Sequence, residues 1–160
     1  MDTSEELTGP YHDFWILDKK TNSTEDFLDF SGRKDAPVRL EDDLILYLND
    51  TLKWVPTQSV TGDKLKGLHF YSITIIMDDG AVFLRNLIKN WLGIFKLAPD
   101  NFTLTGSYGF QLNDEALPVD EGSYTKHMIH KSILISKLEK LLEMAEVASE
   151  GQHFILHLGI

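Results

Sequence analysis

The sequence contains no cysteine, and this absence excludes several classes of site. Without a thiol the chain forms no disulfide, ligates no iron–sulfur cluster or zinc–thiolate centre, and offers no thiolate nucleophile. The chain has 160 residues, and a single core of that size buries roughly 70% of the surface that the unfolded chain exposes. A disulfide or a structural metal is therefore not needed for stability.

Long apolar runs are also missing. Charged residues interrupt every apolar stretch within about ten residues, which is too short to span a bilayer. Residues 1–6 are acidic and no apolar segment follows them, so we expect no signal peptide. These features predict a cytoplasmic protein with one domain over residues 1–160, in which residues 1–10 form a loose acidic tail.

Basic residues are scarce. The chain has 15 lysines and arginines against 25 aspartates and glutamates, a net charge of −10. A field of this sign repels phosphate backbones and anionic lipids, so we expect neither nucleic acid nor membrane as a partner. It would accelerate the encounter with a basic protein. The alternative is that the charge serves only solubility.

Motifs of catalysis and cofactor binding are absent. The chain has no G-x-S-x-G elbow and no H-E-x-x-H, and the glycine-rich residues 105–109 lack the Gly-Lys-Ser/Thr of a phosphate-binding loop. The glycines there predict a bulge or bend in a strand. Asp78 and Asp79 are adjacent and precede a predicted helix, where capping explains them better than acid–base chemistry. We therefore predict no catalytic residue and no cofactor.

The six histidines are the first candidates for metal ligands. On a strand, His127 and His130 would point to opposite faces. His153 and His157 would share a face but lie about 13 Å apart along the strand, too far for one metal ion. We therefore predict no metal site, although His69 from another strand leaves a fold-assembled pocket of histidines and carboxylates as an alternative.

Hydrophobic periodicity predicts an α+β fold with a mixed or largely antiparallel sheet and about three helices. Helices are expected over residues 40–54, 80–97 and 136–148, the last opened by a capping box at Ser136 and Glu139. Strands are expected over residues 11–17, 67–77, 102–111, 124–135 and 152–160, with a less regular one around Phe27, Leu28 and Phe30. Residues 57–66 are expected to form a surface loop.

Acidic clusters are the candidate binding residues. No lysine or arginine lies between residues 111 and 124, and this acidic loop suits docking onto a basic surface. A second cluster opens the first predicted helix, and a tryptophan near the end of that helix is a candidate interface anchor. The predicted partner-binding residues are Asp114, Glu115, Asp120, Glu121, Glu41, Asp42, Asp43 and Trp54. The alternative is that the acidic residues form solvated loops and a helix cap, and that Trp54 is core.

Several short segments together resemble small immunity proteins of bacterial polymorphic-toxin systems. They are GLHFY at residues 67–71, DG at 79–80 leading into the helix over 84–95, AP at 98–99, LTG at 104–106 and ILHLGI at 155–160. The resemblance implies a cytoplasmic binding protein that neutralises a cognate toxin by covering its active site, and it carries over no catalytic residue.

The functional expectation is therefore a non-enzymatic protein-binding module, with an immunity or antitoxin role as its most specific form. One alternative is a small enzyme or ligand-binding domain with a fold-assembled pocket. Another is a homo-oligomer whose acidic face is merely solvated.

Overall fold

Three helices and eight strands make up the part of the chain that the structure describes, which confirms the α+β class. The structure is a computed structural model, and it describes residues 10–24 and 36–160. The strands are β1 (Tyr11–Asp18), β2 (Val38–Glu41), β3 (Pro56–Gln58), β4 (Lys64–Lys66), β5 (Ile73–Ile76), β6 (Asn101–Gly109), β7 (Ser123–His130) and β8 (His153–Leu158). The helices are α1 (Asp42–Leu52), α2 (Asp79–Phe95) and α3 (Lys131–Ser149).

Six of the strands form one sheet in the order β2-β1-β8-β5-β3-β4, and every pairing in it is antiparallel. β8, the last strand of the chain, lies between β1 and β5. It pairs with β1 from Asp13↔Leu158 to Asp18↔His153. The strand expected at the C-terminal end therefore exists, and it occupies the interior of the sheet.

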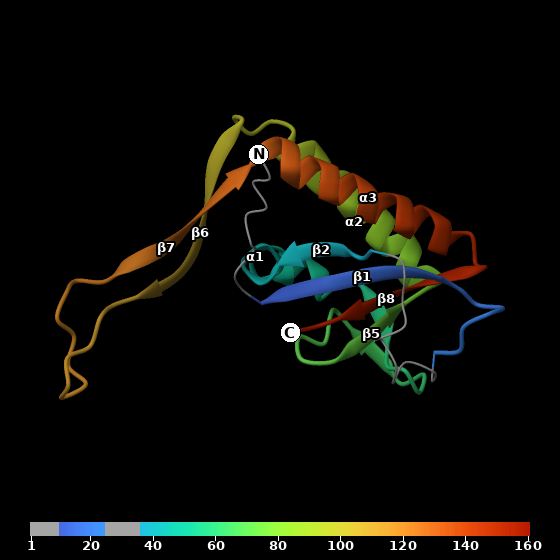
Figure 1. The fold of residues 1–160 in the computed structure, drawn as a ribbon, viewed down its shortest axis with the longest axis horizontal. Coiled ribbons are helices and arrows are strands. Elements are labelled where there is room, and N and C mark those ends of the chain that lie inside the picture. Colours follow the sequence, from blue (N-terminus) through green and yellow to red (C-terminus); the bar gives the residue numbers. More distant parts are fainter. Residues whose placement is uncertain (1–9, 25–35) are drawn as a thin grey trace.

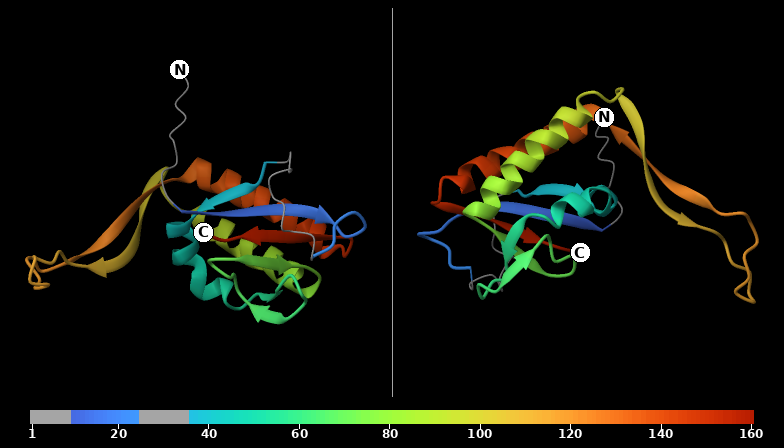
Figure 2. Two further views of the ribbon diagram at one scale, coloured as in Figure 1. Left: turned by 60° about the horizontal axis from the view of Figure 1, so that its bottom comes forward. Right: turned by 180° about the vertical axis from the view of Figure 1, so that it is seen from behind.

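The helices form a layer on one face of this sheet. α2 and α3 lie side by side across it (Figures 1 and 2). Successive strand residues alternate between the two faces, so Phe14 and Ile155 join the helix-facing core while Trp15 and Leu156 belong to a second apolar cluster on the opposite face. The sheet therefore carries a buried apolar cluster on each face.

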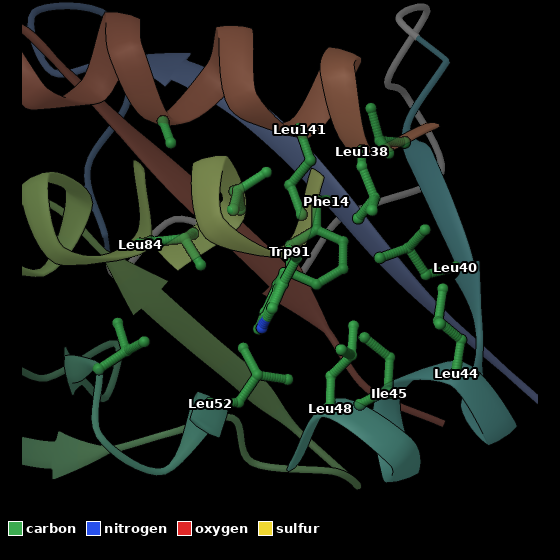
Figure 3. Close-up of a cluster of buried hydrophobic side chains, with 14 of the residues drawn as sticks. Phe14, Leu40, Leu44, Ile45, Leu48, Leu52, Leu84, Trp91, Leu138 and Leu141 are labelled. Carbon is green, nitrogen blue, oxygen red and sulfur yellow. The ribbon is translucent and has the colours of Figure 1, made fainter. Parts of the chain in front are cut away.

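Helix α2 illustrates how the pattern of the sequence makes this core. Its buried side chains recur at three- and four-residue spacing, which places them on one side of the helix. Trp91 is the largest of them and packs among leucines and isoleucines of α1 and α3 (Figure 3). The indole N–H of Trp91 also donates to Thr51 Oγ1 at 3.2 Å, so the polar atom of the ring is satisfied.

Three boundaries differ from the sequence expectation. Leu40 belongs to β2 and not to the first helix, because it pairs with His12 of β1. Residues 57–66 were expected to be a loop, but they contribute to the hairpin of β3 and β4. Only Ile73–Ile76 of the strand expected over residues 67–77 is extended.

The largest correction concerns residues 131–135, which were expected to end a strand. They form the first turn and a half of α3, so the capping box at Ser136 and Glu139 lies inside that helix. The physical reason is that the apolar stripe of α3 already includes Leu134, four residues before Leu138. The expected strand around residues 27–30 and the expected tail at residues 1–10 lie outside the described residues, except for Pro10.

Among the described helices, none combines the length and the apolar character needed to cross a bilayer.

Candidate functional site

A two-stranded ribbon projects from the body of the protein. β6 and β7 pair antiparallel with each other, from Asn101↔His130 to Gly109↔Ser123, and form a sheet of their own. The ribbon leaves the body beside the N-terminal end of α3 and extends away from both the helices and the main sheet (Figures 1 and 2). We call residues 101–130 the arm and residues 110–122 its tip.

The base of the arm is fixed to the body through one face. Leu104 is 7% exposed and belongs to the main core. Phe102 stacks on Phe95 of α2 at 5.9 Å between ring centroids. His127 Nδ1 lies 3.1 Å from Asp43 Oδ2 at the start of α1. On the other face of the ribbon Met128 is 65% exposed. The base of the arm therefore packs against the body through one face and exposes the other to solvent.

The expected irregularity at the glycine-rich segment is confirmed. The register of β6 against β7 shifts between Thr105 and Tyr108. A Cβ atom at Gly106 would lie 2.2 Å from Thr125 Oγ1 and 2.7 Å from His127 Nε2, so only glycine fits there without a shift of the neighbours. Such a bulge increases the local twist of a ribbon and redirects the strand beyond it.

The tip folds on itself by short-range hydrogen bonds. Asn113 Oδ1 accepts from the backbone N–H groups of Glu115 and Leu117, each at 3.0 Å. The N–H of Asn113 donates to the carbonyl oxygen of Leu117 at 2.9 Å. Asp120 Oδ1 accepts from the backbone N–H groups of Gln111 at 3.3 Å and Gly122 at 3.0 Å. The turn therefore has a defined conformation before any partner binds.

This geometry divides the four acidic residues predicted in the loop into two groups. The carboxylate of Asp120 holds the turn together. The carboxylates of Asp114, Glu115 and Glu121 are exposed, and no other residue within the described ranges forms a hydrogen bond or ion pair with them. Three negative charges are thus available to a partner, and the fourth acidic residue shapes the surface that carries them.

Apolar side chains are concentrated on the same segment. Of the 18 large hydrophobic side chains exposed in the described residues, seven lie between residues 108 and 128. They are Tyr108, Phe110, Leu112, Leu117, Val119, Tyr124 and Met128. Large apolar side chains exposed in number on one segment are typical of interaction sites in soluble proteins, and an isolated two-stranded hairpin is only marginally stable in water. The arm therefore has the composition of a surface that binds another chain.

The other predicted acidic cluster lies at the β2–α1 junction, and each of its carboxylates contacts a different element. Glu41 Oε1 accepts from Lys137 Nζ of α3 at 2.9 Å. Asp42 Oδ1 lies 2.8 Å from His12 Nε2 of β1, and Asp43 contacts the arm through His127. The cluster thus connects α3, the sheet and the arm. The predicted anchor Trp54 is 60% exposed.

A chain of buried polar groups extends inward from Asp42. His12 Nδ1 lies 2.8 Å from His157 Nε2, and His157 Nδ1 lies 3.3 Å from Thr74 Oγ1. Thr74 Oγ1 in turn accepts from the backbone N–H of His69 at 2.8 Å. His12, Thr74 and His157 are each 0% exposed.

Burial decides the protonation state of one ring in this chain. Burial, with His12 and His69 nearby, lowers the pKa of His157 from its ordinary 6.5 to about 3. His157 is therefore neutral at physiological pH. A neutral imidazole has one donor and one acceptor nitrogen, and in His157 these two atoms face His12 and Thr74.

This network joins a histidine to a carboxylate, which is the chemistry of the alternative fold-assembled pocket, but it lies inside the core. A general base needs access to its substrate, and rings that are 0% exposed do not offer it. A surface hollow lies elsewhere, between the base of the arm and α3, lined by residues including Lys96, His130 and Lys131. Within residues 10–24 and 36–160, no three histidine or acidic side chains gather closely enough to hold a metal ion.

Sequence reasoning located the acidic residues of the tip but missed the apolar ones around them. The signal was present, because aromatic and aliphatic residues alternate with glycines and acids on both sides of the predicted loop.

A scan against protein-family models and searches of curated proteins and of solved structures each returned no match.

Proposed function

We propose that this protein is a non-enzymatic binding module that docks onto a basic protein partner through the tip of its arm. The observation that carries the proposal is the joint display of free carboxylates and exposed apolar side chains on one pre-formed turn. Apolar contacts would supply most of the binding free energy, while the acidic residues would accelerate association and exclude acidic competitors.

The most specific form of the proposal is a cytoplasmic immunity protein or antitoxin. The resemblance to immunity proteins of polymorphic-toxin systems supports this form, as does the net charge of −10, which complements a basic toxin. A projecting ribbon is well suited to enter and cover a concave active site. In that role the protein requires no catalytic group, cofactor or metal of its own.

The test begins with capture of the partner. Neighbouring-gene products are co-expressed with the protein, and retained proteins are identified by mass spectrometry after elution in rising salt. A stoichiometric basic partner released by high salt would support the proposal. If no protein is retained and native mass spectra show a bound small molecule instead, the ligand-binding alternative is favoured.

The second stage measures association kinetics with that partner. Reversing the free charges of the tip with Asp114→Lys, Glu115→Lys and Glu121→Lys should slow association by roughly tenfold or more at low salt, with less effect at high salt. The matched control combines Glu143→Lys and Glu146→Lys on α3 with Glu150→Lys directly after it. All three residues are exposed, and the control changes the net charge equally. Equal slowing by both triple variants would show that net charge acts rather than the tip.

A further inference from the structure

The buried histidine pair, His12 and His157, lies beneath side chains that reach the surface. Both rings are 0% exposed. Asp42 of α1 covers His12 on one side, and the Phe70 ring meets it in a T-shaped arrangement with 5.0 Å between centroids. Asp42 and Phe70 are themselves partly exposed. A displacement of the start of α1, or of the segment that carries Phe70, would therefore admit water to the pair.

The first turn of α1 joins this pair to the arm. Asp42 Oδ1 lies 2.8 Å from His12 Nε2. The next residue, Asp43, contacts His127 of β7 at 3.1 Å. Among the described residues, Glu41 at the N-cap position forms no side-chain hydrogen bond with this turn, and uncapped helix ends fray. The same weakly held turn therefore carries one contact with the buried pair and one with the base of the arm.

A proton added to His157 places a charge where the fold offers little compensation. The titratable groups that face this ring are His12 of β1 and His69 of the segment before β5, and both disfavour a further positive charge. Thr74 of β5 faces it with an uncharged hydroxyl, and the Asp42 carboxylate lies beyond His12 at the other ring nitrogen. This burial is the main reason why the pKa of His157 is lowered to about 3. Proton uptake at His157 therefore favours a state in which the ring reaches water.

We propose that residues 42–43 and 68–72 form an acid-sensitive latch that releases the base of the arm. In the closed state the latch covers the histidine pair and Asp43 holds His127. In acid the open state binds a proton that the closed state does not bind, so the population of the open state rises. Opening separates Asp43 from the arm, whereas Leu104 and Phe102 keep their contacts with the core. The arm then stays attached but is held less firmly.

The other contacts of the α1 turn do not predict loosening in acid. Protonation of His127 strengthens its attraction to the Asp43 carboxylate, which would hold the arm more firmly. Glu41 Oε1 accepts from Lys137 Nζ of α3 at 2.9 Å, and this contact contains no histidine. The range from pH 7.5 to 5.0 also lies above that in which carboxylates ordinarily titrate. Loosening of the arm in this range therefore has to originate at the buried pair.

A role for the latch in regulating docking rests on the proposed function, because it assumes that a partner binds the tip. The latch itself is a property of the isolated chain and is tested without a partner. Failure to find a partner would therefore leave the latch intact, and an inert latch would leave the docking proposal intact.

The test measures amide hydrogen exchange of the purified full chain by NMR between pH 7.5 and 5.0. After correction for the intrinsic pH dependence of exchange, the rates give an opening equilibrium constant for each amide. The latch is read at the amides of Asp42 and His69, which donate hydrogen bonds in the closed state. The arm is read at residues 102–104 and 127–129 of the β6–β7 ladder.

One ring that gains a proton on opening raises the opening constant about tenfold per pH unit below its ordinary pKa of about 6.5. Latch and arm-base amides should therefore open roughly 30-fold more at pH 5.0 than at pH 7.5. Amides in the middle of α2 should stay at least about tenfold better protected at both pH values, as a local opening requires.

Two variants and one control assign the response. His157→Gln removes the titrating ring, so its latch and arm-base amides should change by less than about threefold over the same range. His153→Gln, on the same strand, should behave like the unmodified protein. Asp43→Ala removes the link to His127, so the latch amides should keep their response while the arm-base amides lose it.

The unmodified chain tests the proposal even if a variant does not fold. Equal opening of the arm-base amides at pH 7.5 and 5.0 would overturn the coupling to the arm. Latch amides that open only together with α2 would overturn the local device. A full pH response in folded His157→Gln would show that another group titrates, and it would overturn the assignment to the buried pair.

Discussion

The buried His157 ring, paired with His12, is expected to lower the free energy of unfolding as the pH falls. The pKa of His157 is lowered in the folded protein to about 3, whereas the unfolded chain has the ordinary value of 6.5. Between these values the unfolded state binds a proton at His157 and the folded state does not. The contribution of this group is therefore fully present above pH 6.5 and is lost as the pH falls toward 3.

The magnitude comes from the difference between the pH and the unfolded pKa. One pKa unit corresponds to about 1.36 kcal/mol, so at about pH 5 the proton bound by the unfolded chain lowers the free energy of unfolding by about 2 kcal/mol. That is a large part of the ~5–15 kcal/mol by which domains are usually stable. Other groups also titrate in this range, and relief of the net negative charge acts in the opposite direction, so a variant is needed to isolate His157.

The informative variant is His157→Gln, whose amide does not titrate but keeps a donor and an acceptor for His12 and Thr74. Urea unfolding of both proteins, followed by tryptophan fluorescence, gives the free energy of unfolding at a series of pH values. The variant is expected to be less stable near pH 7.5, and its deficit should shrink by about 2 kcal/mol at about pH 5. His153→Gln, on the same strand, controls for the loss of a histidine. Parallel curves for the unmodified protein and His157→Gln would refute the assignment of a neutral buried His157.

Three further predictions concern packing and the arm. Gly80→Ala should destabilise the protein by about 3 kcal/mol in urea unfolding, because the added Cβ would lie 2.1 Å from the carbonyl oxygen of Pro56 in β3. A Cβ at Gly93 in the same helix meets nothing within 4 Å, so Gly93→Ala should stabilise the protein by about 0.5–1 kcal/mol. Leu138→Ala should cost about 3 kcal/mol in the same assay, since the side chain is 0% exposed in the core, and a loss below about 1 kcal/mol would contradict that packing. Asp120→Ala should accelerate amide hydrogen exchange at the tip, because it removes two hydrogen bonds of the turn. Asp114→Ala should leave exchange there unchanged. Equal effects of the two variants would contradict the conclusion that Asp120 holds the turn and Asp114 does not.

Local periodicity was a sound guide where one element buries one continuous stripe. The helix expected over residues 80–97 appears as Asp79–Phe95, because its apolar residues recur every three or four positions without interruption. The boundary between β7 and α3 was misplaced for the opposite reason. Residues 131–135 combine polar and β-branched side chains that suit a strand as well as a helix, and their helical state depends on Leu134 continuing the stripe of α3.

The acidic triplet shows why a functional interpretation of single residues needs the fold. Glu41, Asp42 and Asp43 read as one acidic patch in the sequence. In the structure the three carboxylates contact Lys137, His12 and His127, which come from three different elements. Because these contacts join residues 30 to 96 positions apart, no local sequence pattern predicts them.

The sequence by itself determined the α+β class, the acidic balance, the absence of thiol chemistry and the place of the base-free acidic loop. These properties depend on composition and on patterns within one element. Only the tertiary structure decided that β8 lies in the interior of the sheet, that His12, His157 and Asp42 meet, and that the acidic loop is the tip of a projecting arm with apolar side chains around it. Each of these depends on packing between elements distant in the chain. The free energy of burial there is shared among many residues, so the pattern of a single segment does not predict the contact.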